Sequence, residues 1–305
     1  MAIIVTGASG NFGRQVTALL LEKVPASELI LTTRRPEGLA DRAAQGAQVR
    51  HADFDDAATL PAAFAGGDRM LLISTARVGG RVIQHQRAVD AAKAAGVKHI
   101  VYTSSAGLDP KSPAIVIRDH QATEDLIKAS GLAYTFLRDA QYAEAIAGAV
   151  APLAVASGRW VASAGEGHMA FVSRDDCVAC AAAVLTSAGH ENQTYELTGP
   201  ERLTFKQACQ MLSDVVGKPV EYVPTDDEGM FAYWDALGVP RKPVDDQIVQ
   251  GVPWNSDDMV TYEQAIREGF FDILTDNVET IIGRKPRSLR QVLEENREAI
   301  LAGPR

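Results

Sequence analysis

The sequence predicts a doubly wound α/β fold built on a parallel sheet, and two observations lead to this prediction. Short apolar runs without polar alternation recur along the first half of the chain, as in strands that are covered on both faces. Stretches with helical spacing of apolar residues separate these runs, and this alternation is typical of a parallel sheet with helices on both sides. We therefore expect six parallel strands between residues 1 and 138.

The first strand, Ile3–Val5, leads into a turn with Gly7, Gly10 and Gly13 at G-x-x-G-x-x-G spacing. Glycine permits a tight turn, lets a pyrophosphate approach the backbone and lets the next helix lie close to the strand. An apolar stripe at helical spacing begins at Val16, so the turn opens a helix whose free N–H groups form an anion site. Because the turn stands between a strand and a helix, it predicts dinucleotide binding rather than an ordinary connection.

The second strand, Leu29–Thr33, ends in Arg34 and Arg35. In dinucleotide-binding folds the end of this strand faces the adenine ribose. A carboxylate there binds the free hydroxyls of NAD, whereas an arginine complements a 2′-phosphate. The sequence has no acid at this point, which favours NADPH over NADH. The alternative is a solvated basic pair on a loop.

The third strand, expected over residues 49–53, ends in Asp53 and Phe54. This position commonly brackets the adenine ring, so Asp53 could accept a hydrogen bond from the exocyclic amine. The alternative is that Asp53 caps a helix that starts near Ala57. The residues alone do not decide between the two.

Three further strands are expected over residues 70–75, 99–103 and 133–138, with intervening helices over about 80–95 and up to Ser130. Ligands of doubly wound sheets bind beyond the carboxyl ends of the strands, where the strand order reverses. Several separate features of the sequence therefore predict one ligand-binding crevice at these strand ends. The segments at these strand ends are Gly7–Gly13, Arg34, Asp53, Ser74–Thr75, Ser104–Ser105 and Arg138–Tyr142.

Beyond about residue 150 the alternation becomes irregular. We expect residues 1–150 to form an NADP-binding Rossmann domain and residues 151–305 to form a smaller α+β substrate lobe interleaved with it. The expected elements of the lobe are strands around 160–161, 170–172, 195–197 and 220–223, a helix over 177–185, a helix capped by Thr204 that runs to Val216, helices and loops over 226–257, and a closing helix.

Composition and charge restrict the function classes. The net charge of −9 over 305 residues argues against nucleic acid or an anionic membrane as the main partner. We find no apolar stretch long enough to span a bilayer, and the first strand begins too early to leave room for a signal or transit peptide. Three cysteines provide no disulfide framework. We expect a cytoplasmic, reduced protein that is a monomer or a homodimer.

Several catalytic motifs are missing. None of the seven tyrosines has a lysine four residues later, so the Tyr-x-x-x-Lys dyad of standard short-chain dehydrogenases is absent. Cys177 and Cys180 lie on neighbouring turns of a small-residue helix and are expected to pack, and no metal-ligand spacing is visible. His120 lies on the helix between strands five and six, where a histidine near the nicotinamide could supply a proton. The alternative is a helix histidine bonded to a backbone carbonyl.

Several segments resemble the NmrA-like group of atypical short-chain dehydrogenases. Within that group they are most similar to the branch of bacterial NADPH:quinone oxidoreductases and triphenylmethane reductases. The likeness covers roughly residues 1–225. It is carried by the segments Val5–Gly13, Lys23–Ser27, Leu71–Ser74, Ala94–Ile100, Tyr134–Arg138 and Ala188–Leu197.

The resemblance implies NADPH as the donor and a hydrophobic aromatic acceptor. It implies that the phosphates are held by Gly7, Ser9, Gly10, Asn11, Phe12, Gly13 and Arg34, and the ribose–nicotinamide path is lined by Ser74, Thr75, Thr103 and Ser104. Related lignan reductases have a catalytic lysine where this chain has His120. For the acceptor pocket we expect Gln141, Tyr142, Phe171 and Trp234.

The sequence and the resemblance together favour a reductase that passes hydride from NADPH to a quinone or another electron-poor aromatic acceptor. One alternative is reductive cleavage of a lignin-derived benzylic ether, which would need a proton donor such as His120. A second is a non-catalytic NmrA-like sensor of NADP(H), which needs a cofactor site but no acceptor pocket.

Overall fold

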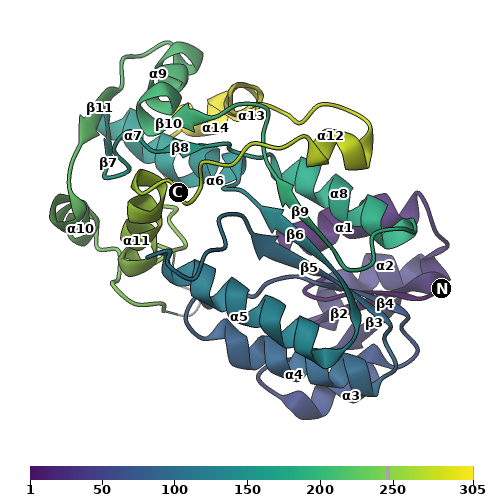
Figure 1. The fold of residues 1–305 in the computed structure, drawn as a ribbon. Helices are drawn as coiled ribbons and strands as arrows, with labels where there is room; N and C mark the ends of the chain where they lie inside the picture. Colours follow the sequence, from purple (N-terminus) through teal and green to yellow (C-terminus); the bar gives the residue numbers. More distant parts are fainter. Residues whose placement is uncertain (245–247, 305) are drawn as a thin grey trace.

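The computed structural model describes residues 1–244 and 248–304, and a parallel sheet of seven strands forms its centre. The strand order β3-β2-β1-β4-β5-β6-β9 changes direction at β1 and β4, the point at which doubly wound sheets bind ligands. The predicted doubly wound sheet is confirmed, with one strand more than expected. The strands are β1 (Ile3–Val5), β2 (Leu29–Thr33), β3 (Gln48–His51), β4 (Arg69–Leu72), β5 (His99–Ser105), β6 (Ala133–Asp139) and β9 (Gln193–Leu197) (Figure 1).

Different helices cover the two faces of the sheet, because successive residues of a strand point to opposite faces. On β1, Ile3 and Val5 pack in the core that includes side chains of α1 and α8, whereas Ile4 packs in the core under α3, α4 and α5. Helices α4 and α5 run side by side along this second face (Figure 1). The helices are α1 (Asn11–Leu21), α2 (Ala40–Ala44), α3 (Leu60–Phe64), α4 (Arg81–Ala94), α5 (Ile115–Ser130) and α8 (Arg174–Thr186).

The chain beyond residue 150 contributes to the sheet as well as to the lobe. Strand β9 pairs in parallel with β6, with Leu197 opposite Asp139, and α8 packs against α1. The sequence places residues 195–197 in the lobe, whereas the structure uses them to cover the otherwise unpaired edge of β6. Residues 170–172 are not a strand, because only an isolated bridge joins Val172 to Tyr142.

The lobe is built from short strand pairs and helices. Strand β7 (Arg159–Ala162) pairs in parallel with β11 (Glu221–Pro224), and β8 (His168–Met169) pairs antiparallel with β10 (Leu203–Thr204). As predicted, Thr204 caps the next helix, in a capping box with Gln207. The helices are α6 (Ala143–Ala145), α7 (Ala151–Ser157), α9 (Phe205–Val216), α10 (Asp227–Ala236), α11 (Ser256–Arg267), α12 (Asn277–Ile282), α13 (Leu289–Glu295) and α14 (Arg297–Leu301).

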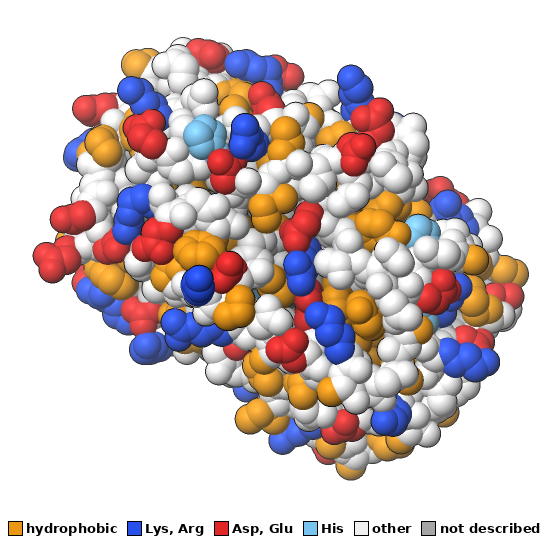
Figure 2. Space-filling model, viewed as in Figure 1, with side chains coloured by type: hydrophobic (Ala, Val, Ile, Leu, Met, Phe, Trp, Pro, Cys, Tyr) orange, Lys and Arg blue, Asp and Glu red, His pale blue; other side chains and the backbone are white. Residues whose placement is uncertain are grey.

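The surface carries charges of both signs. On the face shown in Figure 2, acidic and basic side chains are interspersed, and hydrophobic side chains lie between them in small groups. Among the residues that the structure describes, no helix has the length and apolar character needed to cross a bilayer.

Candidate active site

The glycine turn after β1 has a geometry that fits a phosphate. Gly7 has a φ of +57°, a left-handed conformation that favours glycine. A Cβ atom at Gly13 would clash with the Gly7 carbonyl oxygen and lie 2.7 Å from the Cα atom of Ala8. Helix α1 therefore begins closer to the turn than a side chain at residue 13 would allow. The first N–H groups of α1 have no intrahelical acceptor, so this backbone cradle fits a dinucleotide pyrophosphate.

Side-chain hydrogen bonds connect the glycine turn to the end of β2. The hydroxyl oxygens of Ser9 and Thr33 lie 2.6 Å apart, and the Thr33 hydroxyl accepts a bond from the Arg35 N–H at 3.1 Å. Arg14 donates to the Ser9 carbonyl at 2.9 Å and, through its other branch, to the Gly38 carbonyl. These bonds fix the turn against the loop that carries the basic pair.

The remaining side chains predicted for this end of the site differ in exposure. Arg34 and Arg35 are exposed directly after β2, and Asn11 is exposed at the start of α1. The Phe12 ring is 9% exposed and packs in the core, so Phe12 can meet a phosphate only through its backbone. An exposed guanidinium pair at this strand end fits a 2′-phosphate.

Asp53 follows β3 and makes a local contact: its Oδ1 accepts a hydrogen bond from the Asp55 N–H at 2.9 Å. The short helix that begins at Ala57 is capped by Asp56, whose carboxylate accepts from the Ala58 N–H. The alternative that Asp53 is the cap is therefore wrong. Asp53 and Phe54 are both partly exposed, and a contact with adenine stays a prediction.

The predicted hydroxyl residues lie together beyond β4 and β5. The Ser74 N–H donates to the Thr103 hydroxyl at 2.8 Å, and the Thr75 N–H donates to Nε2 of His85 at 3.2 Å. Strand β4 ends at Leu72, so Ser74 and Thr75 belong to the following loop. The hydroxyl of Ser104 donates to Glu124 at 2.8 Å. All four predicted residues line one large cavity.

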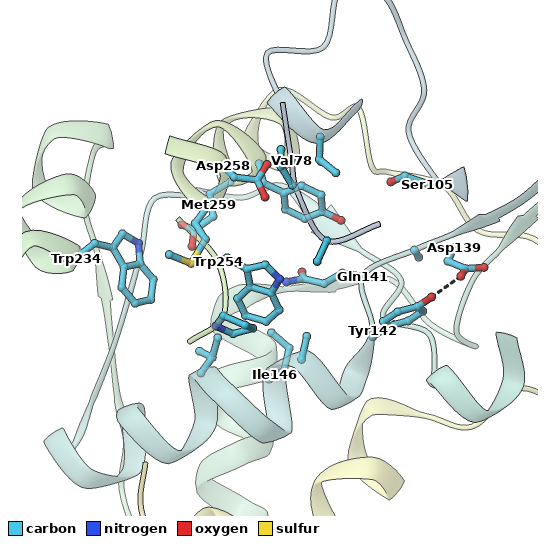
Figure 3. Close-up of a pocket in the computed structure, with 18 of the residues that line it drawn as sticks. Val78, Ser105, Asp139, Gln141, Tyr142, Ile146, Trp234, Trp254, Asp258 and Met259 are labelled. Atoms are coloured by element: carbon cyan, nitrogen blue, oxygen red, sulfur yellow. Dashed lines mark hydrogen bonds between the residues drawn. The ribbon is translucent and has the colours of Figure 1, made fainter. Parts of the chain in front are cut away.

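This cavity extends from the carboxyl ends of β4, β5 and β6 into the lobe and encloses about 470 Å³. Its volume falls in the range of small-molecule sites. Gln141 and Tyr142 line it beside the sheet, and Trp234 lines it in the lobe (Figure 3). The sequence did not single out the other large lobe side chains around it, which include Met230, Tyr233, Trp254, Met259 and Tyr262.

Phe171 was predicted to line the acceptor pocket, but it is not among the residues that line the cavity. Its side chain is 2% exposed and packs in the core, with its ring centroid 5.8 Å from that of Phe205. Because residues 170–172 form no strand, strand alternation does not set the side to which this ring points, and the ring packs in the core.

His120 is buried in the cavity wall, and both ring nitrogens have side-chain partners. Nε2 lies 2.8 Å from Nη1 of Arg81, and Nδ1 lies 2.8 Å from the Tyr102 hydroxyl. A guanidinium only donates, so Nε2 is the acceptor and the ring proton lies on Nδ1. Burial first, and then Arg81, lowers the pKa of His120 well below its ordinary value. Proton donation by His120 would require its bond to Tyr102 to break.

A buried carboxyl group lies at the end of β6, beside the predicted pocket residues. Asp139 is 7% exposed, and its Oδ2 lies 2.5 Å from the Tyr142 hydroxyl (Figure 3). Burial raises the pKa of Asp139 to about 7, while the bond from Tyr142 and the nearby Cys177 thiol oppose this rise. The sequence placed Asp139 inside the converging segment 138–142 but did not single it out. An acid at the carboxyl end of a buried strand is the signal that could have identified it.

Two further acids lie in the lobe part of the wall. Asp258 is 8% exposed, and among the described residues its Oδ1 has no hydrogen-bond partner. Burial raises its pKa to about 6. Burial also raises the pKa of Glu263 to about 7, although Glu263 accepts bonds from the N–H and hydroxyl of Ser163. The apolar cavity thus includes carboxyl groups that can hold protons near neutral pH.

Known proteins are similar to this chain in both fold and sequence. The family model described as NAD(P)H-binding matches residues 7–188. Quinone oxidoreductase 2 of Escherichia coli is 40% identical over 238 residues, which cover 78% of this chain and 82% of that protein. NAD(P)H azoreductase of Xenophilus azovorans is 32% identical over 251 residues, covering 80% and 84%.

Two solved structures extend the comparison over nearly the whole chain. Triphenylmethane reductase of Citrobacter sp., in complex with NADP(H), has a TM-score of 0.84 at 33% identity and covers 97% of this chain and 100% of that one. The NADPH complex of the Escherichia coli quinone oxidoreductase has a TM-score of 0.87 at 34% identity, with coverage of 96% and 99%.

The fold and the site therefore define an NAD(P)H-dependent oxidoreductase. More particularly, the chain belongs to the NAD(P)H-binding family, and its relatives are NmrA-like oxidoreductases, as the sequence resemblance predicted.

Proposed function

We propose that this protein reduces a quinone or another hydrophobic, electron-poor aromatic acceptor at the expense of NADPH. The observation that supports the proposal is the continuity of the cavity, which joins the carboxyl ends of three central strands to the aromatic and methionine side chains of the lobe. When bound, NADPH supplies hydride from its nicotinamide ring. The lobe side chains hold the acceptor at the sheet and exclude water.

Most of the predicted cofactor residues have a role in this proposal, whereas a contact of Asp53 or Phe54 with adenine stays a prediction. The glycine turn holds the pyrophosphate, and Arg34 with Arg35 holds the 2′-phosphate that separates NADPH from NADH. Ser74, Thr103 and their neighbours line the path toward the nicotinamide. His120 orients Arg81 and Tyr102 within the wall and gives no proton to the acceptor.

The relatives' names also support an aromatic acceptor, because they refer to quinones, azo compounds and triphenylmethanes. A sensor without turnover needs no acceptor cavity, so the cavity favours catalysis. We place the protein in the cytoplasm, where its free cysteines, which are buried, stay reduced.

The test is NADPH oxidation by the purified protein with menadione, an azo dye and crystal violet, followed by absorbance. We expect turnover with at least one acceptor and a lower KM for NADPH than for NADH. NADPH binding without oxidation across the panel would contradict a reductase of aromatic acceptors and favour the sensor.

A further inference from the structure

A hydrogen-bonded pair of a carboxyl group and a phenol, Asp139 and Tyr142, lies within the cavity wall. Both residues line the cavity, Asp139 at the last position of β6 and Tyr142 directly before α6. In the sheet Asp139 is paired with Ser105 of β5, so the carboxyl group stands at the same edge as the residues that line the nicotinamide path. A single hydrogen bond of 2.5 Å joins its Oδ2 to the Tyr142 hydroxyl.

The second carboxylate oxygen of Asp139 lacks a partner in the described part of the chain. Oδ1 of Asp139 is buried and has no hydrogen-bond partner among the described residues. A buried, ionised carboxylate normally has several donors or a cation, because burial disfavours its charge. Among the described residues Tyr142 is the one hydrogen-bond donor to Asp139 and no ion pair joins this carboxyl group, so its protonated form is stabilised and it can hold a proton at neutral pH.

The charged and titratable groups that face the pair come from α8 and from the pair itself. Cys177 and Cys180 lie near enough to Asp139 to interact with it electrostatically. Burial raises the pKa of both thiols, so they remain neutral. The Arg174 guanidinium lies 5.2 Å from the centroid of the Tyr142 ring. Burial first, and then the neighbouring Asp139 carboxyl, raise the pKa of Tyr142 well above its ordinary value, and the Arg174 guanidinium opposes this rise.

We propose that Asp139 and Tyr142 deliver the proton that accompanies hydride transfer to a neutral acceptor. The acceptor gains hydride, with its two electrons, from NADPH, which is oxidised to NADP⁺. The O–H bond of Tyr142 breaks, and its proton forms a new O–H bond on the acceptor oxygen. Asp139, protonated on Oδ2, passes its proton to the Tyr142 oxygen, and a proton from the solvent restores the carboxyl group afterwards. Tyr142 is then a catalytic residue, and Asp139 acts through it.

This inference depends on the proposed function and predicts a distinction between two kinds of acceptor. A quinone becomes a hydroquinone only by gaining a proton as well as hydride. A triarylmethane cation such as crystal violet becomes its neutral leuco form by gaining hydride alone. Loss of the proton that this pair donates should therefore slow quinone reduction much more than dye reduction. A merely structural role for the pair would affect both acceptors alike.

The experiment compares kcat for menadione and crystal violet in the wild type, Asp139→Asn and Tyr142→Phe. Asparagine retains the shape and can still accept from Tyr142, but it holds no transferable proton. We expect kcat for menadione to fall about 100-fold, the usual contribution of general acid catalysis, and kcat for the dye to change much less. The wild-type rate with menadione should rise as pH falls through about 7, and Asp139→Asn should lose this dependence.

A second measurement needs no cofactor. The raised pKa means that folded protein keeps a proton on Asp139 that the unfolded chain releases near pH 4. The wild-type Tm should therefore fall, relative to that of Asp139→Asn, as pH rises from about 4 to about 7. Asp90→Asn is the matched control, because it makes the same substitution at an exposed carboxylate outside the cavity and should leave the ratio of the menadione and dye rates unchanged.

Equal losses with both acceptors in Asp139→Asn, or no loss with either, would overturn the inference and leave the proposed function intact. A wild type that oxidises NADPH with neither acceptor would overturn the proposed function, and this inference with it.

Discussion

The cofactor side and the acceptor side of this molecule are built in different ways. On the cofactor side, backbone groups of residues 7–13 and the start of α1 form the cradle, with Arg34 and Arg35 a short distance along the chain. On the acceptor side, side chains from β6, α10 and α11 meet around the cavity although they are far apart in sequence. A site made of contiguous backbone depends on a few glycines, whereas a site made of distant side chains depends on the packing of the whole lobe.

The largest expected effect comes from Gly13→Ala, which tests whether the cofactor side depends on backbone approach. The new Cβ would clash with the Gly7 carbonyl, so the turn and α1 must separate. Overpacking of this kind costs about 1–3 kcal/mol, and it also distorts the phosphate cradle. We expect a lower Tm and loss of detectable NADPH binding by fluorescence titration.

Gly148→Ala is the control for this variant. Gly148 is exposed and a Cβ there would meet no atom within 4 Å. In a helical segment alanine should be neutral or stabilising by about 0.5–1 kcal/mol. Equal damage by both substitutions would mean that any alanine for glycine is harmful, and would remove the argument for close approach at Gly13.

A smaller effect is expected from Arg34→Glu, which tests the specificity of the cofactor side. Loss of a charge-assisted contact with the 2′-phosphate should weaken NADPH binding by about 1.5–3 kcal/mol and leave NADH binding nearly unchanged. The measurement is Kd for both cofactors by titration. Lys218→Glu makes the same charge change at an exposed residue in the turn between α9 and β11. Similar losses for NADPH and NADH would refute the assignment.

The same contrast explains what the sequence could predict. The glycine spacing, the basic pair and the first six strands follow from local patterns, and the structure has β2 and α5 close to the expected positions. Strand β9 was assigned to the lobe because pairing with β6 is a long-range contact that local patterns do not contain. Trp234 was predicted in the pocket and lies there, whereas Phe171 faces the core, since no local pattern fixes which way a loop residue points.

The buried polar groups were the least accessible to sequence reasoning. His120 was predicted as a candidate from its place on the helix between strands five and six and from the lysine of related lignan reductases, but its partners Arg81 and Tyr102 come from other elements. The protonation state of Asp139 depends on its burial and, in the opposite direction, on the contact with Tyr142. Such states arise from the tertiary environment, so the type of a residue does not reveal them.

The smallest effect is expected from Trp234→Phe, which should affect the acceptor side alone. The Trp234 side chain is 4% exposed and lines the cavity, and its Nε1 has no hydrogen-bond partner among the described residues. Phenylalanine removes this unpaired donor, whose burial is unfavourable, and leaves a modest gap. The two effects on stability oppose each other, so Tm should change little. For the acceptor, loss of ring area and of the free N–H should raise KM a few-fold, about 1 kcal/mol, with Kd for NADPH unchanged.

Phe64→Leu, at the end of α3 in the core on the second face of the sheet, should do the reverse by lowering Tm and leaving KM unchanged. A rise in Kd for NADPH in Trp234→Phe would mean that the lobe also shapes the cofactor cradle, and the two sides would then not be independent.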